Sequence, residues 1–155
     1  MTEKPESDPQ DWPAFIKAHF SSAVPFVREM GVTVEDTREG YALISMPLVP
    51  GRHANSYGFA HGGVAALLVD MAAGVAFRTL RSTVVTIETT ATYLAPIPLP
   101  NTVRAEARVT QRGRRILHAD VEIRIDDGTL AARGRAIYMA TGPDRGVYPA
   151  PPPRA

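Results

Sequence analysis

A long segment in the middle of the chain, from about His61 to Leu80, has the composition of an α-helix that is apolar on every side. A helix on a protein surface keeps one polar face, so a helix without such a face is enclosed by other structure. The single acidic side chain between His61 and Phe77 is Asp70. We therefore expect a central helix around which the rest of the chain folds, with one carboxylate in otherwise apolar surroundings.

Segments with the pattern of β-strands lie on both sides of this helix. In residues 102–110, Val103, Ala105, Ala107 and Val109 alternate with polar residues. This two-residue period is typical of an antiparallel strand with one solvent-exposed face. The strand-like segments are Val32–Thr37, Tyr41–Leu48, Thr83–Leu94, Thr102–Thr110, Arg115–Ile125 and Leu130–Ala140. The four that follow the helix are expected to form a meander. One long helix against one antiparallel sheet gives the fold class α+β.

The two ends of the chain differ from its middle in composition. Residues 1–10 and 142–155 are rich in proline and polar residues, and we expect both segments to be flexible. Between them, a helix start is indicated at Asp11, and residues 24–30 have the composition of a second short helix. We expect these N-terminal helices to act as a lid or a brace on a single domain of residues 11–141.

Charge and cysteine content exclude several functions. The chain has 17 Lys and Arg residues against 16 Asp and Glu residues, which gives no electrostatic reason to expect binding to nucleic acid or an anionic membrane. It contains no cysteine, which excludes disulfides, thiolate metal ligands and a cysteine nucleophile. The N-terminus lacks the apolar stretch of a secretion signal, and no apolar run is long enough to span a bilayer. We therefore expect a cytoplasmic protein.

Asp70 is the residue that most directly suggests chemistry, because an ionised carboxylate is costly to bury without partners. The residues on its own helix stripe are small: Gly63, Ala66, Ala73 and Gly74 lie at i−7, i−4, i+3 and i+4. Such a stripe admits either a substrate or another backbone, so it is compatible with a cleft and with close packing. A structural acid, satisfied by backbone amides or an arginine, is the alternative to a catalytic one.

The sequence His61-Gly62-Gly63 is expected to begin the central helix. Two glycines let a ligand approach the backbone closely, and the unpaired amides at a helix N-terminus attract an oxygen with negative charge. A carbonyl oxygen that gains negative charge during a reaction would fit this pocket. For His61, capping the helix or orienting a ligand is one interpretation, and acid–base chemistry is the other.

Other common sites have weaker support in the sequence. The histidines show no compact spacing of metal ligands, and no Gly-x-Ser-x-Gly motif marks a serine hydrolase. The four histidines are His19, His53, His61 and His118. Arg112, Arg114 and Arg115 surround a glycine in an expected hairpin turn, where they either bind phosphates or simply face solvent.

The spacing of the central residues resembles that of a known family. Asn55 is followed after five residues by His61-Gly62-Gly63, and Asp70 lies nine residues after the histidine. In identity and spacing this pattern is similar to the hotdog-fold acyl-CoA thioesterases of the phenylacetic acid degradation (PaaI-like) group. The segment Thr86–Pro96 resembles the strand that follows the helix in that family, and the resemblance extends over about residues 24–141.

The resemblance implies a hotdog fold, an antiparallel sheet wrapped around the long helix, in a homodimer or homotetramer with active sites at the dimer interface. It implies that Asp70 is the catalytic acid, as general base or nucleophile, and that the Gly62 amide polarises the thioester carbonyl. His61 and Asn55 would orient the thioester and the attacking water. Thr86 is the expected hydroxyl residue near the reaction centre.

The implied substrate is an aryl- or medium-chain acyl-CoA, which is hydrolysed to the free acid and CoA without a cofactor or a metal. Aimed amides can stabilise the oxyanion of such a reaction by on the order of 3 kcal/mol each. The residues expected to contact CoA are Gly63, Ala95, Pro96, Arg112, Arg114 and Arg115.

A non-catalytic acyl-CoA-binding or sensor protein of the same fold is the alternative, since a fold alone does not define an activity. Dehydratases and hydratases of this fold have a different arrangement of histidine and acid, which this sequence lacks. A binder would keep its ligand affinity in an Asp70→Asn variant and show no turnover in either form. An enzyme would lose turnover and keep binding.

Overall fold

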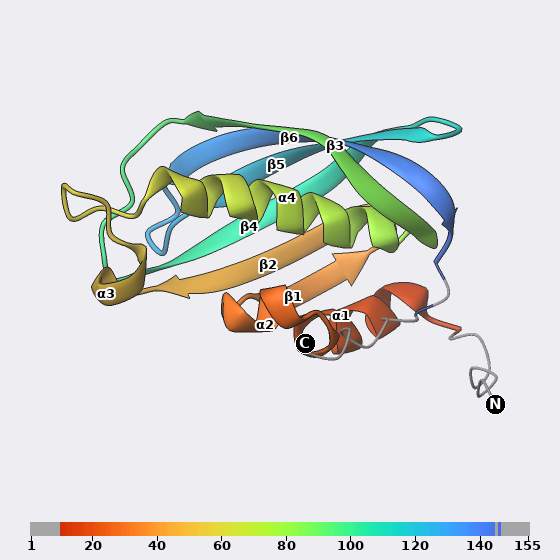
Figure 1. The fold of residues 1–155 in the computed structure, drawn as a ribbon, viewed down its shortest axis with the longest axis horizontal. Coiled ribbons are helices and arrows are strands. Elements are labelled where there is room, and N and C mark those ends of the chain that lie inside the picture. Colours follow the sequence, from red (N-terminus) through yellow and green to blue (C-terminus); the bar gives the residue numbers. More distant parts are fainter. Residues whose placement is uncertain (1–9, 145, 147–155) are drawn as a thin grey trace, which may run out of the picture.

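The structure, a computed structural model, describes residues 10–144 and 146 (Figure 1). The helices are α1 (Trp12–Ala23), α2 (Pro25–Glu29), α3 (Pro50–His53) and α4 (Gly62–Arg78). The strands are β1 (Thr33–Arg38), β2 (Tyr41–Leu48), β3 (Ser82–Tyr93), β4 (Asn101–Arg112), β5 (Ile116–Arg124) and β6 (Leu130–Pro143). Each helix and strand expected from the sequence is present, and their ends differ from the expected ones by a few residues.

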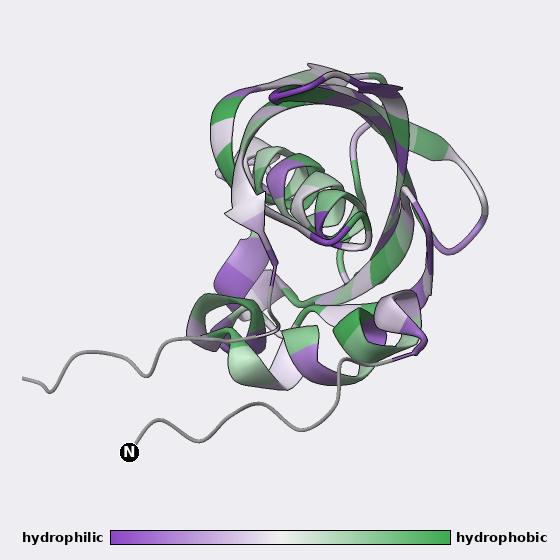
Figure 2. Ribbon diagram, turned by 90° about the vertical axis from the view of Figure 1, so that its right-hand side faces the viewer, coloured by the Kyte–Doolittle hydropathy of each residue, from purple (hydrophilic) through white to green (hydrophobic). Residues whose placement is uncertain are grey.

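All six strands belong to one antiparallel sheet, in the order β1-β2-β4-β5-β6-β3. The sheet curves around α4, and the end-on view shows the helix held inside this curve with the N-terminal helices outside it (Figure 2). This arrangement confirms the expected α+β hotdog architecture, in which a single antiparallel sheet wraps one long helix.

The pairing of β3 corrects the expected four-strand meander. β4, β5 and β6 do form a meander, but β3 pairs with β6 at the edge of the sheet, with Thr86 opposite Tyr138. β4 pairs with β2 on its other side. The connection between β3 and β4, residues 94–100, contains three prolines. Prolines cannot donate to a strand ladder, so this segment crosses between distant parts of the sheet instead of forming a tight turn.

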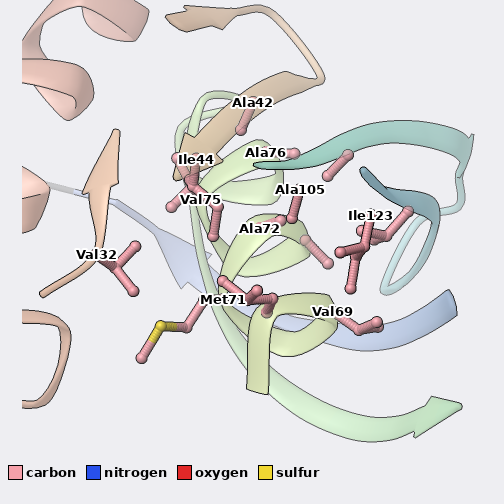
Figure 3. Packing of buried hydrophobic residues seen from close by; sticks show 14 of the residues in the cluster. Val32, Ala42, Ile44, Val69, Met71, Ala72, Val75, Ala76, Ala105 and Ile123 are labelled. Carbon is pink, nitrogen blue, oxygen red and sulfur yellow. The ribbon is translucent and has the colours of Figure 1, made fainter. Parts of the chain in front are cut away.

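The core lies between α4 and the inner face of the sheet (Figure 3). Its fully buried members include Ile44, Val69, Ala72, Val75, Ala105 and Ile123. The strands contribute alternate residues, as the period-two pattern predicts. The sequence indicated a helix enclosed on every side, but one side of α4 is open. A stripe that includes Asp70 and Gly74 remains partly exposed, on the side where α4 faces the edge strand β3.

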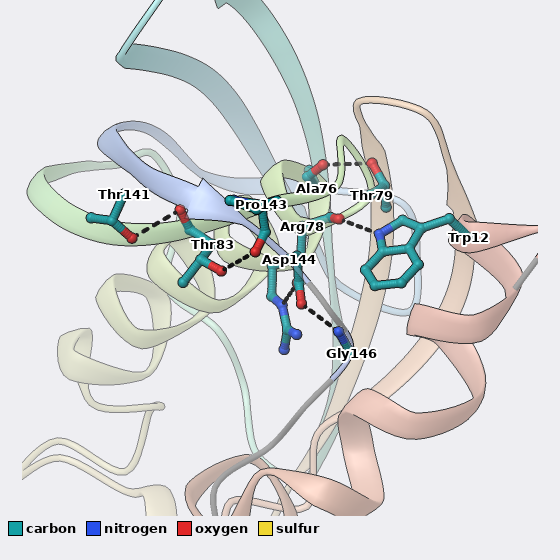
Figure 4. Close-up of polar contacts among 9 residues, drawn as sticks. All are labelled: Trp12, Ala76, Arg78, Thr79, Thr83, Thr141, Pro143, Asp144 and Gly146. Atoms are coloured by element: carbon teal, nitrogen blue, oxygen red, sulfur yellow. Dashed lines mark hydrogen bonds and ion pairs between the residues drawn. The ribbon is translucent and has the colours of Figure 1, made fainter. Parts of the chain in front are cut away.

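The first helix acts as a brace for the far end of α4 (Figure 4). Asp11 caps α1, since its carboxylate accepts a hydrogen bond from the Ala14 N–H at 3.1 Å. The Trp12 indole then donates to the Arg78 carbonyl oxygen at 2.7 Å. The Arg78 guanidinium pairs with Asp144, whose side chain is only 4% exposed. Between a lid and a brace, the structure therefore shows a brace.

Ordered structure continues beyond the expected domain end at residue 141. β6 runs to Pro143, and the Asp144 N–H donates to the Arg81 carbonyl oxygen at 2.9 Å. The buried ion pair of Asp144 explains why this proline-containing segment is held against the domain. The rest of the expected flexible ends, residues 1–9, 145 and 147–155, lies outside the described residues.

A close contact at Gly134 on β6 leads to a stability prediction. A Cβ atom at this position would lie 2.7 Å from Val69 Cγ1 and 2.8 Å from the Thr90 carbonyl oxygen, so strand and helix could not keep their spacing. We expect Gly134→Ala to lower the free energy of unfolding by about 2 kcal/mol, the usual size of an overpacking effect. Urea unfolding at one fixed protein concentration measures this change.

Gly142→Ala is the matched control, because it lies on the same strand and a Cβ there would have no atom within 4 Å. It should change the free energy of unfolding by less than about 0.5 kcal/mol. Equal effects of the two substitutions would contradict the packing described for Gly134.

Candidate active site

His61 caps the N-terminus of α4. Its ring atom Nδ1 accepts a hydrogen bond from the Gly63 N–H at 2.9 Å. The backbone N–H of His61 donates to the His53 carbonyl oxygen at 2.7 Å. Because Nδ1 is the acceptor, a neutral His61 carries its proton on Nε2. Of the two interpretations of this histidine, the capping contact is the one present in the structure.

The two glycine amides differ in their hydrogen bonding. The Gly63 N–H is occupied by His61, which departs from the expectation of two unpaired amides. The Gly62 N–H finds no acceptor within residues 10–144 and 146. Gly62 is the first residue of α4, where the partial positive charge of the helix end is concentrated. It is therefore the donor available to an incoming oxygen.

Asn55 organises the loop that leads into α4. Its Oδ1 accepts hydrogen bonds from the Tyr57 N–H at 2.8 Å and the Phe59 N–H at 3.2 Å. These bonds fix the side chain and leave its NH2 group without an acceptor in the described part of the chain. Asn55 thus adds a second available donor beside the helix start.

A cavity of about 370 Å³ adjoins this helix start. Asn55 and Gly62 lie on its wall, together with the expected contact residues Ala95 and Pro96 and with apolar side chains such as Ile97. A hollow that is mostly apolar, with a few donors on its wall, is the usual form of a site for a small organic ligand.

Tyr93, the last residue of β3, also borders the cavity. Its hydroxyl donates to the Gly62 carbonyl oxygen at 2.9 Å. A Cβ at Gly62 would lie 3.4 Å from the Tyr93 ring, so the two residues are in close contact. Sequence reasoning did not identify Tyr93, although a polar aromatic residue directly before an expected contact segment was an available signal.

Asp70 lies two turns further along α4 and is held by hydroxyl groups. Its Oδ1 accepts hydrogen bonds from Thr86 Oγ1 at 3.0 Å and from the Tyr138 hydroxyl at 2.6 Å. Neither backbone amides nor an arginine, the partners of a structural acid, donate to this carboxylate within the described residues. The structure thus brings Thr86 to Asp70, as expected, and adds Tyr138.

Burial determines the state of the Tyr138 hydroxyl. Burial, and next to it the hydrogen bond with Asp70, raises the pKa of Tyr138 well above its ordinary value. A tyrosine hydroxyl is already protonated in the neutral range, and the raised pKa keeps this one a donor at higher pH as well. Tyr138 follows the small inward-facing residues Ala132, Gly134 and Ala136 on β6, and a buried tyrosine hydroxyl among such residues needs a polar partner. A tyrosine after a row of small inward-facing residues was thus the signal in the sequence for Tyr138.

The Gly62 amide and the Asp70 carboxylate do not meet within one chain. Asp70 lies eight positions after Gly62 on α4, which corresponds to about 12 Å along the helix axis. A thioester carbonyl within hydrogen-bond reach of Gly62 is therefore too far from Asp70 of the same chain.

The arginine turn lies away from the cavity. Arg112 is the last residue of β4, and Arg114 and Arg115 follow it. β4 extends for about 36 Å from the cavity end of the sheet. Arg112 pairs with Glu39 at 3.5 Å, and Arg115 contacts the Met139 sulfur at 3.5 Å. The structure does not bring these arginines to the Gly62 cavity of the same chain.

Comparison with known proteins identifies the fold family. Residues 57–132, which include the helix start, Asp70 and Thr86, match the family model of the thioesterase superfamily. These residues form a thioesterase-superfamily domain. A candidate esterase of Halobacterium salinarum is 28% identical to the chain over 120 residues, which cover 73% of this chain and 78% of the relative.

Two solved structures share the hotdog fold of this domain. The PaaI protein from the phenylacetic acid degradation operon of Escherichia coli superposes with a TM-score of 0.79 at 22% identity, covering 86% of this chain and 98% of that one. A hypothetical thioesterase protein from Streptococcus pneumoniae, solved with coenzyme A, superposes with a TM-score of 0.69 at 25% identity, covering 73% of this chain and 88% of that one. The family and the fold make the chain a thioester hydrolase.

Neither a metal-binding cluster nor a membrane-spanning helix is found among the described residues. In residues 10–144 and 146, no three His, Asp or Glu side chains gather where they could hold a metal ion. None of the described helices is both long and apolar enough to cross a membrane.

Proposed function

We propose that this chain hydrolyses the thioester of an aryl- or medium-chain acyl-CoA to the free acid and CoA. The observation that carries the proposal is the unpaired Gly62 N–H at the start of α4, on the wall of an apolar cavity. A thioester needs its carbonyl oxygen stabilised as negative charge develops, and a fixed helix-end amide supplies such a donor. The bound coenzyme A in the S. pneumoniae thioesterase supports CoA as the leaving group.

Asp70 is the proposed catalytic carboxylate, either as a general base or as a nucleophile. As a general base it takes a proton from water while the water oxygen bonds to the thioester carbon. The C–S bond then breaks, and the CoA thiolate receives the proton from Asp70. As a nucleophile, the carboxylate itself bonds to the carbon and expels the thiolate, and water then hydrolyses the resulting anhydride. Both routes need the same oxyanion donor at Gly62.

We infer a dimer from the separation of these two groups. β3 is an edge strand, and its Val85 and Ile87 side chains are 46% and 54% exposed. Exposed apolar residues on an unpaired edge favour pairing with a second strand. Two β3 strands joined antiparallel across a two-fold axis would place the two α4 helices antiparallel. Asp70 of one protomer would then face the partner's Gly62 across a shared site.

The remaining residues have supporting roles in this proposal. Asn55 donates to the thioester or to the attacking water, and His61 fixes the helix start. Ala95 and Pro96 contact the CoA arm, because they line the cavity. The arginine turn lies at the Asp70 end of the sheet, so it would reach CoA phosphates only in a site shared with the partner.

The activity is tested by free-thiol release from aryl, short, medium and long acyl-CoAs. We expect turnover that is fastest with aryl or medium-chain substrates, because the cavity next to Gly62 is apolar and of limited volume. Measurable CoA binding without thiol release from any substrate would instead indicate an acyl-CoA-binding protein.

The dimer is tested by light scattering of the purified protein. The expected mass is at least twice that of one chain, which is 16.8 kDa. A mass of one chain, together with full activity, would contradict a site shared between two protomers.

A further inference from the structure

We propose that Tyr138 is a positioning residue for Asp70: with Thr86 it holds the carboxylate by Oδ1 and leaves Oδ2 as the oxygen that reacts. The inference deepens the proposed function and rests on it, because it assigns separate tasks to the two oxygens of the proposed catalytic acid.

The Tyr138 hydroxyl is fixed from several directions. The residue is only 4% exposed, and its ring packs on Phe77 with the centroids 4.8 Å apart. Its hydroxyl lies 2.6 Å from Asp70 Oδ1 and 2.8 Å from the Asp70 carbonyl oxygen. A Cβ at Gly74 would lie 3.4 Å from the same hydroxyl, so α4 packs directly against it. Such a hydroxyl has no freedom to turn toward solvent.

Thr86 approaches the same oxygen from the edge strand. Its Oγ1 lies 3.0 Å from Asp70 Oδ1. The pairing of β3 with β6 shifts register between Thr86 and Glu88, so a β-bulge follows Thr86 directly. Bulges re-aim side chains and are frequent beside active sites. The bulge and the buried tyrosine thus act on one carboxylate from two strands.

These contacts make the two carboxylate oxygens unequal. Oδ1 accepts two hydroxyl donors, whereas Oδ2 has no donor among residues 10–144 and 146. An oxygen whose lone pairs are already engaged is a poorer acceptor for a further proton, and the free oxygen keeps its lone pairs for water or for the acyl carbon. Asp70 lies on the partly exposed stripe of α4, and we assign Oδ2, which has no donor there, as the oxygen that meets a ligand.

The proposal is tested with Tyr138→Phe, which removes the hydroxyl and keeps the buried ring. Hydrogen bonds to charged groups are strong, so we expect kcat to fall by about tenfold or more. KM should change by less than about twofold, because Tyr138 does not line the cavity that holds the substrate. Thr86→Val should have a similar effect on kcat. The double variant should fall further, because Oδ1 then loses both of its donors.

Tyr41→Phe is the matched control. Tyr41 is another buried tyrosine, 8% exposed, but it lies on β2 between Arg38 and Arg108 and away from Asp70. The loss of the Tyr41 hydroxyl should leave kcat and KM unchanged. Thermal unfolding of each variant, measured alongside, should show Tyr138→Phe still folded at the assay temperature.

The possible failures are distinguishable. A wild-type protein that releases no thiol from any acyl-CoA overturns the proposed function, and the positioning role of Tyr138 falls with it. An active wild type whose kcat survives Tyr138→Phe overturns this inference alone. Equal losses of kcat in Tyr138→Phe and Tyr41→Phe, or a loss that appears in KM, would show that the hydroxyl has a general structural role.

Discussion

Replacing Asp70 with asparagine is expected to reduce kcat by about a thousandfold, within the 10²- to 10⁴-fold contribution of a positioned acid or base. Asparagine has nearly the same shape, and its side-chain oxygen can still accept the hydrogen bonds from Thr86 and Tyr138. It can neither take a proton from water nor attack the acyl carbon. Thiol release from the best acyl-CoA substrate measures the loss.

The binding of CoA should remain within about twofold of wild type, because asparagine keeps the shape of Asp70 and the residues proposed to contact CoA are unchanged. Asp120→Asn is a suitable control, since this acid lies on β5 and pairs with Arg135 at 3.2 Å on the outer face of the sheet. It should leave turnover unchanged. Turnover that survives Asp70→Asn would remove Asp70 from the catalytic step.

Gly62→Pro is expected to reduce kcat by about 10²- to 10³-fold, the usual effect of deleting one oxyanion donor. Proline lacks the amide N–H and is well accepted at the first position of a helix, which Gly62 occupies. The preceding residue His61 has φ of −62° and ψ of 139°, the extended conformation that proline favours in its neighbour. The substitution therefore removes the proposed oxyanion donor and lets α4 form.

Gly62→Ala separates the amide from the side chain. Alanine keeps the N–H and adds a Cβ at 3.4 Å from the Tyr93 ring, an ordinary contact. We expect it to retain most of the activity. If alanine and proline reduce kcat equally, crowding near Tyr93 explains the loss, and the oxyanion role of Gly62 is contradicted.

The local features of the fold were readable from the sequence because each depends on neighbouring residues. The alternation in residues 102–110 gave β4, and the apolar run after His61 gave α4. The spacing of Asn55, Gly62 and Asp70 placed two donors and one acid on the elements where the structure shows them.

What the sequence did not show depends on pairing between distant segments. No local pattern states that β3 pairs with β6 and not with β4, so the contact between Tyr138 and Asp70 was not foreseen. The competition between His61 and a ligand for the Gly63 amide depends on one side-chain conformation. The distance from the arginine turn to the cavity likewise follows from the direction of β4 in the sheet.

The central claim is that Asp70 of one protomer and Gly62 of its partner form one thioesterase site. We would co-express Asp70→Asn and Gly62→Pro chains with different affinity tags, purify dimers that contain one chain of each, and measure thiol release. In such a dimer one site pairs an intact Asp70 with an intact Gly62, and the other site has lost both.

We expect about half of the wild-type rate for the mixed dimer, because a two-fold dimer contains two equivalent sites. Each variant alone should be nearly inactive under the same conditions. A mixed dimer as inactive as its two parents would contradict the shared site, since it would show that both groups must come from one chain.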